Sequence, residues 1–294
     1  MPCYHPLKAY RKPKGGVTFS PTKGYRDVPV TIPCGQCIGC RLERSRQWAV
    51  RCMHETQLHE NNCFITLTYN DTYLPHDRSL KIKDFQLFMK RLRKKYTHKI
   101  RFYHCGEYGE KLGRPHYHAI LFGHDFHDKK HHKTINEIPL YVSEELNKLW
   151  GMGHCTLGTA TFDSAAYCAR YILKKVTGDG ADDHYQRVDP ETGEVFQLAP
   201  EYTTMSRRPG IGHGWLKKYQ SDVYPSDEVI VNAKQTKPPK YYDNQYELTN
   251  PKEYDLLKSN RVKQSKKQKE NNTPERLKIR ETIKKHQLKQ LPRS

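Results

Sequence analysis

Two histidines separated by a single residue carry the strongest chemical signal in this sequence. His116 and His118 lie in the run Arg-Pro-His-Tyr-His-Ala-Ile-Leu-Phe, residues 114–122, whose apolar second half is typical of a β-strand. Successive side chains of a strand point to opposite faces, so both imidazoles share one face, about 7 Å apart along the chain, and Tyr117 takes the other. Two imidazoles placed in this way can bind one divalent cation.

A carboxylate on the preceding strand completes a candidate ligand set. Glu107 ends a predicted strand over 100–107, and the connection 108–115 holds two glycines and a proline, which suits a hairpin. The hairpin brings Glu107 beside the histidines. Two imidazoles and a carboxylate with open positions suit Mn²⁺, or Mg²⁺ helped by phosphate oxygens of a substrate. Glu110, in the connection itself, is the alternative third ligand.

A pair of tyrosines lies on a predicted helix over 163–176, with Asp163 or Ser164 as its N-cap. Tyr167 and Tyr171 are four residues apart and are therefore neighbours on one face of the helix. At about 100° per residue, the small and aliphatic side chains gather on the opposite side. These are Ala165, Cys168, Ala169, Ile172, Leu173 and Val176. The tyrosines consequently face away from the expected core.

The composition indicates a polyanionic partner. The chain has 51 Lys and Arg against 32 Asp and Glu, a formal net charge of +19, and its 20 Tyr and 9 Phe can stack on unpaired bases. The N-terminus has no signal-peptide pattern, and no run of about 18 apolar residues predicts a membrane span. Nine cysteines, an odd number, favour a reducing compartment. We expect an intracellular protein that binds nucleic acid.

These features together predict covalent attack of a tyrosine on a phosphodiester. A phenol has a pKa of about 10, so it needs a nearby positive charge to become a good nucleophile. Lys175 follows Tyr171 by one helical turn and can supply that charge, which makes Tyr171 the first candidate and Tyr167 the second. Arg170 and Lys174 flank the pair and are candidate DNA contacts.

The elements that must position these residues alternate along the chain. Apolar periodicity predicts helices over 41–59, 83–96, 142–150 and 163–176, and strands over 63–69, 100–107, 116–122 and 154–161, with a short strand near 28–32. The His-rich stretch 123–133 is typical of a solvated loop. Hairpin-linked strands among helices predict an α+β fold with a largely antiparallel sheet.

Composition divides the chain into three segments. Residues 1–40 are rich in Pro, Gly and Cys, and residues 41–220 contain the predicted sheet and the candidate site. Residues 221–294 form a basic tail whose last part, 251–294, has 14 Lys and Arg against 5 Asp and Glu. We expect this tail to be largely disordered, with at most a loose helix starting at Thr273.

The N-terminal segment contains closely spaced cysteines. Cys34, Cys37 and Cys40 are separated by two residues each, and Cys3 is a candidate fourth thiolate of a structural zinc site, with His5 as a substitute. Reduced thiols in a tight turn are the alternative. The other five cysteines fall in predicted helices or strands and are expected in the core. Arg207 and Arg208, before a Pro-Gly-Ile-Gly run, either contact DNA phosphates or lie in a solvated loop.

The order of these motifs resembles the rolling-circle replication initiators of the HUH endonuclease superfamily. The two-tyrosine helix is similar to that of initiators from small icosahedral single-stranded DNA phages, and three further runs resemble the gokushovirus branch of the microviruses. The runs are Met-Pro-Cys-Tyr-His-Pro at the start, Ile-Pro-Cys-Gly-Gln-Cys-Ile-Gly-Cys-Arg at 32–41 and Ser-Arg-Arg-Pro-Gly-Ile-Gly at 206–212.

The resemblance implies a HUH endonuclease fold, a central five-stranded antiparallel sheet flanked by helices with the histidines on its middle strand. It also implies Tyr167 and Tyr171 as the catalytic pair and His116 and His118 as metal ligands. The resemblance supports Glu107 as a metal ligand less strongly, because the third ligand varies across the superfamily.

The implied activity is sequence-specific nicking at a viral replication origin, with a 5′-phosphotyrosyl intermediate and a later joining step. The partners are then single-stranded origin DNA and the host helicase and DNA polymerase, in the host bacterial cytoplasm. The sequence has no Gly-x4-Gly-Lys-Ser/Thr phosphate loop of its own for a helicase motor.

Two other functions fit parts of the pattern. A relaxase or single-strand transposase also pairs His-x-His with tyrosine, although the N-terminal cysteine run argues against one. A nonenzymatic, zinc-containing DNA-binding regulator would use the basic helices at 41–59 and 83–96 and would bind DNA without forming a covalent adduct.

Overall fold

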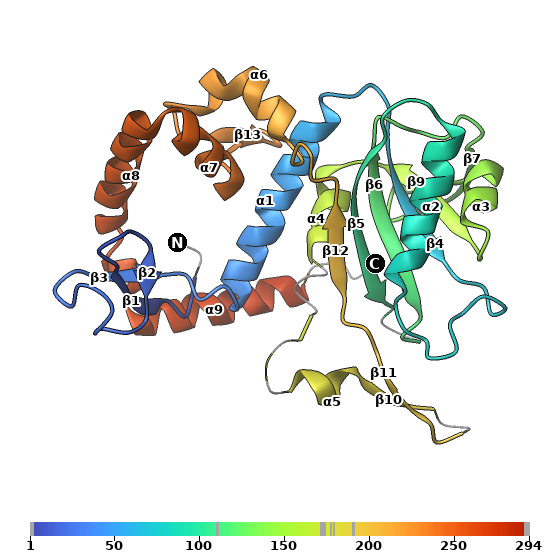
Figure 1. Cartoon of the computed structure of the whole chain (residues 1–294), viewed down its shortest axis with the longest axis horizontal. Helices are drawn as coiled ribbons and strands as arrows, with labels where there is room; N and C mark the ends of the chain where they lie inside the picture. The colour runs from blue at the N-terminus through green and yellow to red at the C-terminus, as the bar shows by residue number, and fades with distance from the viewer. Residues whose placement is uncertain are drawn as a thin grey trace. The chain divides into compact units, whose positions relative to one another are not determined.

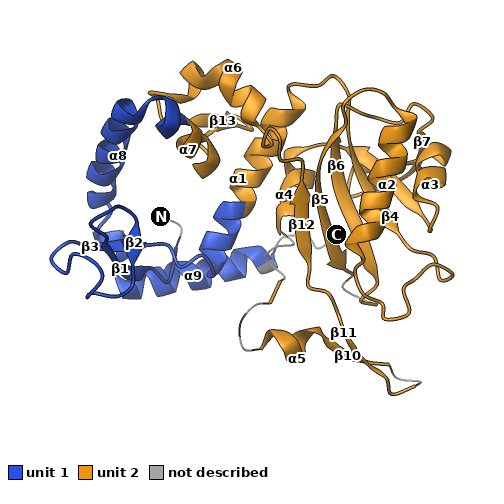
Figure 2. Ribbon diagram, viewed as in Figure 1, with its two compact units in different colours: residues 1–44, 246–294 blue, residues 45–245 orange. Residues whose placement is uncertain are grey.

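The computed structural model describes residues 3–109, 112–170, 175–176, 178, 180–189 and 192–290. The chain divides into two compact units: unit 1 comprises residues 1–44 and 246–294, and unit 2 comprises residues 45–245 (Figure 2). Each is described by itself. The segments 1–40, 41–220 and 221–294 remain a prediction as functional divisions. None of the helices in the described ranges is long and apolar enough to cross a membrane.

Unit 2 is built on an antiparallel sheet, which confirms the predicted α+β class (Figure 1). The sheet has seven strands rather than the five that we expected. Its order is β12 (Tyr202–Met205), β5 (Arg101–Tyr108), β6 (Pro115–Phe122), β4 (Asn62–Thr68), β9 (Cys155–Thr159), β8 (Ile138–Val142) and β7 (Lys130–Ile135).

The His-rich stretch that we expected to be a solvated loop accounts for part of the difference. Strand β7 forms a hairpin with β8, and the two connecting residues, Asn136 and Glu137, have φ of 47° and 66°. Positive φ at both positions is what a type I′ turn requires. His124 is buried rather than solvated. All six residues of β7 are exposed, so no apolar alternation marks this strand in the sequence.

Helices cover both faces of the sheet. Helix α2 (Ile82–Lys95) buries Phe85, Phe88, Met89 and Leu92, and with α3 (Glu144–Trp150) it packs on the face that carries Tyr117. Helices α1 (Ile38–Thr56) and α4 (Phe162–Arg170) contribute Ala49, Cys52, Ala165, Cys168 and Ala169 to the core on the other face, with Ile120 of β6. The candidate histidines share the face of Ile120, because strand side chains alternate.

The rest of unit 2 consists of short elements. They are α5 (Ala181–Tyr185), the hairpin β10 (Gln186–Val188) with β11 (Val195–Gln197), α6 (His213–Val223), the hairpin β13 (Val229–Val231) with β14 (Lys234–Thr236), and α7 (Lys240–Thr249), which continues into unit 1.

Unit 1 combines the two ends of the chain. Strands β1 (Leu7–Arg11), β2 (Val17–Thr18) and β3 (Pro29–Ile32) form a small antiparallel sheet, and α8 (Pro251–Lys266), η2 (Glu270–Asn272) and α9 (Pro274–Lys289) are helical. The tail was expected to be largely disordered, and the structure differs. Tyr254, Leu257 and Leu277 are buried, which supplies the apolar contacts that a charged helix needs in order to be stable.

A buried ion pair in unit 2 offers a test of this fold. The Arg101 Nε atom donates to Glu55 Oε1 at 2.6 Å, and the Gly212 amide donates to Glu55 Oε2 at 2.7 Å. Burial alone would raise the pKa of Glu55, but hydrogen bonds from His59 and Gly212 and the charge of Arg101 lower it. Arg101→Met leaves the Glu55 carboxylate buried without its charged partner. We therefore expect the free energy of unfolding, measured in urea, to fall by about 3–5 kcal/mol.

The same pair predicts a pH dependence. A carboxyl group whose folded pKa is lowered stabilises the fold above its unfolded pKa, about 4.3, and this contribution is lost as the pH falls through the folded value. Urea midpoints measured from pH 7 downwards should therefore fall more steeply for the wild type than for Glu55→Gln/Arg101→Met. Equal stability of Arg101→Met and wild type at pH 7 would contradict this account.

Candidate active site

The central hairpin of the sheet brings together the three predicted metal ligands. In the β5–β6 register, Glu107 lies directly opposite His116. The Nε2 atoms of His116 and His118 lie 2.8 Å and 2.7 Å from the same carboxylate atom, Glu107 Oε1. Glu107 and His118 are buried and His116 is half-buried. Glu110, the alternative ligand, lies outside the described residues.

Contacts behind each ring orient the histidines. His116 Nδ1 lies 3.1 Å from the Arg114 carbonyl oxygen, a contact that orients the ring with Nε2 towards Glu107. His118 Nδ1 lies 3.0 Å from Thr66 Oγ1, and the Phe64 ring stacks on His118 with centroids 5.5 Å apart. Both imidazoles therefore present the same nitrogen to one point.

The carboxylate at the centre of the cluster is held in its charged form. Burial of Glu107 would by itself raise its pKa, but hydrogen bonds from His116 and His118 and their charges lower the pKa below its usual value. A deprotonated carboxylate is the form that binds a metal ion.

The donor set fits a divalent cation. The candidate ligand atoms of Glu107, His116 and His118 all lie within 4.8 Å of one another. Neighbouring ligands of an octahedral ion with bonds of about 2.1 Å are about 3.0 Å apart, and the two Nε2–Oε1 distances, 2.8 Å and 2.7 Å, are within a few tenths of an ångström of that value. Two nitrogen donors and one oxygen donor suit Mn²⁺, and Mg²⁺ when phosphate oxygens complete the shell.

One of the two predicted tyrosines reaches this cluster. The Tyr167 hydroxyl lies 3.3 Å from Glu107 Oε1, and its ring meets the His118 ring edge-on with centroids 5.0 Å apart. Tyr167 is half-buried on α4. The structure thus brings Glu107, His116, His118 and Tyr167 together from two adjacent strands and a helix.

Helix α4 is fastened at its start and along its length. It begins at Phe162, one residue before the predicted start, because Thr161 Oγ1 accepts from the Ser164 amide at 3.1 Å and Ser164 Oγ accepts from the Thr161 amide at 2.8 Å. Ser45 Oγ donates to the Ala166 carbonyl at 3.1 Å, which ties the middle of α4 to α1. These contacts fix the turn that carries Tyr167.

The remaining predicted site residues are not members of the cluster around Glu107 or lie outside the described part of the chain. Tyr171 and Lys174 lie outside the described residues. Arg170 and Lys175 are half-buried, and Arg207 and Arg208 are exposed in the loop that follows β12.

Several positioning residues did not emerge from the sequence. Phe64 and Thr66 are on β4, whose register places Thr66 opposite His118. In the predicted strand 63–69 they alternate with Ile65, and this alternation could have shown that both side chains lie on one face of the sheet. Tyr117 is fully buried on the other face, where its hydroxyl donates to the Lys81 carbonyl at 3.1 Å and lies 2.8 Å from the Tyr69 hydroxyl.

The four predicted zinc ligands converge in unit 1. The sulfur atoms of Cys3, Cys34, Cys37 and Cys40 all lie within 4.8 Å of one another, and the Cys34–Cys40 and Cys3–Cys37 pairs are 4.0 Å apart. His5, the substitute ligand, instead pairs with Glu281 at 2.8 Å. Burial would raise the pKa of Cys37, but backbone amides that donate to its sulfur lower it to about 6.

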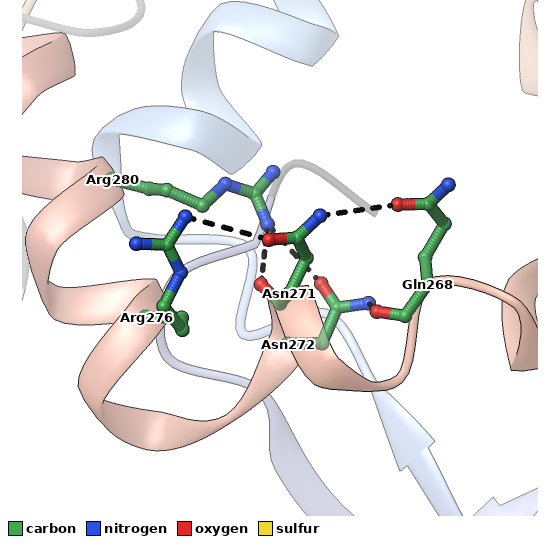
Figure 3. Close-up of a pocket in the computed structure, with 5 residues that line it drawn as sticks. All are labelled: Gln268, Asn271, Asn272, Arg276 and Arg280. Atoms are coloured by element: carbon green, nitrogen blue, oxygen red, sulfur yellow. Dashed lines mark hydrogen bonds between the residues drawn. The ribbon is translucent and has the colours of Figure 1, made fainter.

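Two pockets lie outside these clusters. One, in unit 1, is lined by Arg276 and Arg280 of α9 together with Gln268, Asn271 and Asn272 (Figure 3). Arg280 donates to the Asn271 carbonyl at 2.9 Å. The other, in unit 2, is lined by several histidines, including His98 and His124, whose ring nitrogens lie 3.3 Å apart. Neither pocket contains a predicted site residue.

Comparison with known proteins identifies the family. The model of the family described as replication-associated protein ORF2/G2P matches residues 62–176, which include β4 to α4. The replication-associated protein VP4 of Bdellovibrio phage phiMH2K is 34% identical over 265 residues, 86% of this chain and 80% of that protein. The replication-associated protein ORF2 of Spiroplasma virus 4 is 31% identical over 296 residues, 90% of this chain and 87% of that protein.

A third relative covers less of both chains. The replication-associated protein ORF4 of Chlamydia phage 1 is 34% identical over 168 residues, 52% of this chain and 41% of that protein. No solved structure matches the chain significantly. The resemblance to microviruses is confirmed by these relatives: the chain belongs to the family of microvirus replication-associated proteins.

Proposed function

We propose that this chain is a divalent-metal-dependent endonuclease and strand transferase that nicks single-stranded DNA at the viral origin and starts rolling-circle replication. The observation that carries the proposal is the contact of the Tyr167 hydroxyl with Glu107, the carboxylate that His116 and His118 share. A nucleophile candidate thereby lies beside a candidate metal site, as phosphodiester cleavage through tyrosine requires. Kinship to replication-associated proteins of three phages fits this role.

The chemistry assigns a task to each side chain. When bound by Glu107, His116 and His118, a divalent cation would polarise a nonbridging phosphate oxygen and stabilise charge on the leaving oxygen. The phenol oxygen forms a bond to phosphorus while the bond from phosphorus to the 3′ oxygen breaks. The phenol proton passes to solvent, and the 3′ oxygen takes up a proton from water. The products are a 5′-phosphotyrosyl ester and a free 3′-OH for a polymerase.

Tyr171, the first candidate from the sequence, is proposed as the other nucleophile of the pair. Two tyrosines four positions apart in the sequence would allow one to hold the earlier 5′ end while the other cuts the new origin. Lys175, with Arg170 and Lys174, would supply positive charge near the phenols and the phosphate, and Arg207 and Arg208 would contact the backbone. Unwinding and synthesis would come from the host helicase and DNA polymerase in the bacterial cytoplasm.

The test uses single-stranded oligonucleotides tiled along the viral strand, incubated with the full chain and Mn²⁺ or Mg²⁺. We expect one tile to yield a protein band whose mobility on a denaturing gel is reduced. With a 3′ label on that tile the protein should become labelled, and with a 5′ label a shortened free oligonucleotide should appear. Binding of the tiles with no covalent band in either metal would favour a nonenzymatic DNA-binding regulator.

We further infer that the four cysteines of unit 1 bind structural zinc. A tetrahedral ion with Zn–S bonds of about 2.3 Å holds its sulfur atoms about 3.8 Å apart, close to the 4.0 Å of the Cys34–Cys40 and Cys3–Cys37 pairs. Amides that donate to Cys34 and Cys37 sulfur at 3.3 Å would stabilise the thiolates. The alternative of reduced thiols in a turn predicts no bound metal.

The zinc assignment predicts one tightly held zinc ion per chain by elemental analysis. Cys37→Ser should lose the ion and lower the thermal midpoint of unfolding, because zinc binding contributes to folding free energy. Cobalt substituted for zinc should give the intense visible bands of tetrahedral thiolate coordination. Cys155→Ser, which changes a buried cysteine of unit 2, is the matched control and should keep the zinc. A zinc-free wild-type protein would contradict the assignment.

A further inference from the structure

The N-terminal sheet, residues 7–32 of unit 1, has both of its ends held by the cysteine cluster. Cys3 and Cys34 flank the sheet, and the Cys34 amide donates to Cys3 sulfur at 3.3 Å. Strand β1 lies between β2 and β3, with Tyr10 opposite Thr18 and Ala9 opposite Val30. The segment is therefore a closed, hydrogen-bonded element rather than a loose terminus.

This sheet exposes aromatic side chains instead of burying them. Phe19 is 62% exposed and Tyr25 is 48% exposed. Leu7, Val17 and Val28 in the same segment are also exposed. A single exposed apolar residue is ordinary, but five within 22 residues indicate a surface that meets a partner.

The charge of the segment identifies the class of that partner. Between residues 7 and 32 the chain has six cations, Lys8, Arg11, Lys12, Lys14, Lys23 and Arg26, against one acid, Asp27, a net charge of +5. A partner that binds through apolar side chains alone would not require this excess of positive charge, whereas a polyanionic partner would. Exposed aromatic rings interleaved with cations are the combination that binds unpaired nucleic acid.

Backbone contacts hold Tyr25 in place. The Tyr25 amide donates to the Arg11 carbonyl at 2.9 Å. Gly24 packs so closely that a Cβ atom there would lie 2.7 Å from Tyr10 Cβ and 2.9 Å from Thr18 Cγ2. Only glycine permits this approach. The ring of Tyr25 thus starts from a fixed backbone position, which lowers the entropy lost on binding.

We propose that the N-terminal sheet binds single-stranded DNA, with bases stacked on Phe19 and Tyr25 and phosphates contacted by neighbouring lysines. Unpaired DNA is favoured over duplex because base pairs stacked in a helix do not offer their faces to a side chain. The proposal rests on the proposed function, which makes single-stranded origin DNA the substrate. It adds a binding surface, independent of the nicking chemistry, that requires no particular base sequence.

The experiment measures fluorescence anisotropy of a labelled oligothymidine of about 20 nucleotides with the full, zinc-loaded chain. We expect Kd to rise about tenfold for each ring lost in Phe19→Ala and Tyr25→Ala. Phe19→Trp should retain affinity, and Phe19→Leu, which stays apolar but cannot stack, should lose it. Ile230→Ala, at a position 69% exposed in unit 2, is the control and should bind like wild type.

A second measurement tests the phosphates. Lys12→Gln/Lys14→Gln should lower the slope of log K against log salt by about 1.4, since each phosphate contact on a single strand contributes about 0.7. Unchanged Kd in Phe19→Ala/Tyr25→Ala, or full affinity of Phe19→Leu, would overturn the proposal. Equal losses for a duplex of the same length would also overturn it.

Separate variants test the DNA-binding surface and the proposed nicking activity, so the failure of one can be told from the failure of the other. Phe19→Ala/Tyr25→Ala should still form the covalent adduct with a short origin oligonucleotide at saturating concentration, whereas Tyr167→Phe/Tyr171→Phe should bind oligothymidine like wild type. One result would support the binding surface and reject the nicking proposal. In it, neither the wild type nor any variant forms an adduct, but loss of Phe19 and Tyr25 still weakens oligothymidine binding.

Discussion

Tyr167→Phe/Tyr171→Phe will form no covalent adduct with origin DNA, even at long incubation and high Mn²⁺ concentration. Phenylalanine keeps the ring that meets His118 edge-on but removes the oxygen that would bond to phosphorus. The loss should be complete, because no intermediate can form without a nucleophile. Labelled DNA retained by the protein on a denaturing gel is the measurement, with initial rates for each single variant.

The single variants tell whether the tyrosines act alike. The 3.3 Å contact of the Tyr167 hydroxyl with Glu107 leads us to expect a strong defect in Tyr167→Phe. Lys175, four positions after Tyr171 in the sequence, leads us to expect a strong defect in Tyr171→Phe as well. Tyr73→Phe, at a tyrosine of unit 2 that is 53% exposed, should react at the wild-type rate. An adduct that persists undiminished in the double variant would place the nucleophile elsewhere.

Glu107→Gln is expected to slow adduct formation by about 100-fold or more at a metal concentration that saturates the wild type. The amide has the size of the carboxylate but lacks the charge that binds a cation. Metal ions contribute several kcal/mol to stabilising such transition states, and 1.36 kcal/mol corresponds to tenfold in rate. His118→Ala should behave similarly, because it removes another of the three converging donors.

Initial rates measured over a range of Mn²⁺ concentrations distinguish a loss of metal affinity from a loss of folded protein. If Glu107→Gln regains part of its rate at high Mn²⁺ while its thermal midpoint is unchanged, the defect lies in metal affinity. His132→Ala, at an exposed position on β7, removes an imidazole far from the cluster in the sheet order and should leave the metal dependence intact. A wild-type metal titration for Glu107→Gln would show that these side chains do not form the metal site.

The core strands and helices could be predicted because each buries one face. The predicted strands 63–69, 100–107 and 116–122 correspond to β4, β5 and β6 within one residue at each end, and the predicted helix 83–96 corresponds to α2. Strand β7 could not be predicted in this way, since it lies at the sheet edge with every side chain exposed. Its existence depends on the turn at Asn136 and Glu137 and on pairing with β8.

The helices near the C-terminus show a second limit. Their charge suggests a solvated tail, but Glu281 of α9 pairs with a residue near the other end of the chain. His5 and Glu281, 276 positions apart, are in contact within unit 1. No local pattern reveals a contact at such a separation, so the expected disorder of 221–294 followed from composition alone.

The candidate site was accessible to prediction for a geometric reason. Alternation along one strand placed His116 and His118 on one face, and a hairpin placed Glu107 opposite His116. The helical spacing placed Tyr167 away from the aliphatic face. The supporting contacts of Thr66 and Phe64 depend on which strand lies next to β6, and strand order is a tertiary property that spacing does not encode. The contribution of Tyr171 stays a prediction.

Tyr117 separates the two candidate metal ligands in the chain and points into the opposite layer, where Lys81 and Tyr69 hold its hydroxyl. A rotation or slippage of β6 would break those bonds at the same moment as it moved the imidazoles. Substitutions behind the sheet should therefore alter the rate of the proposed nicking reaction. The hydrophobic layer behind the sheet and the candidate metal site are joined through this one side chain.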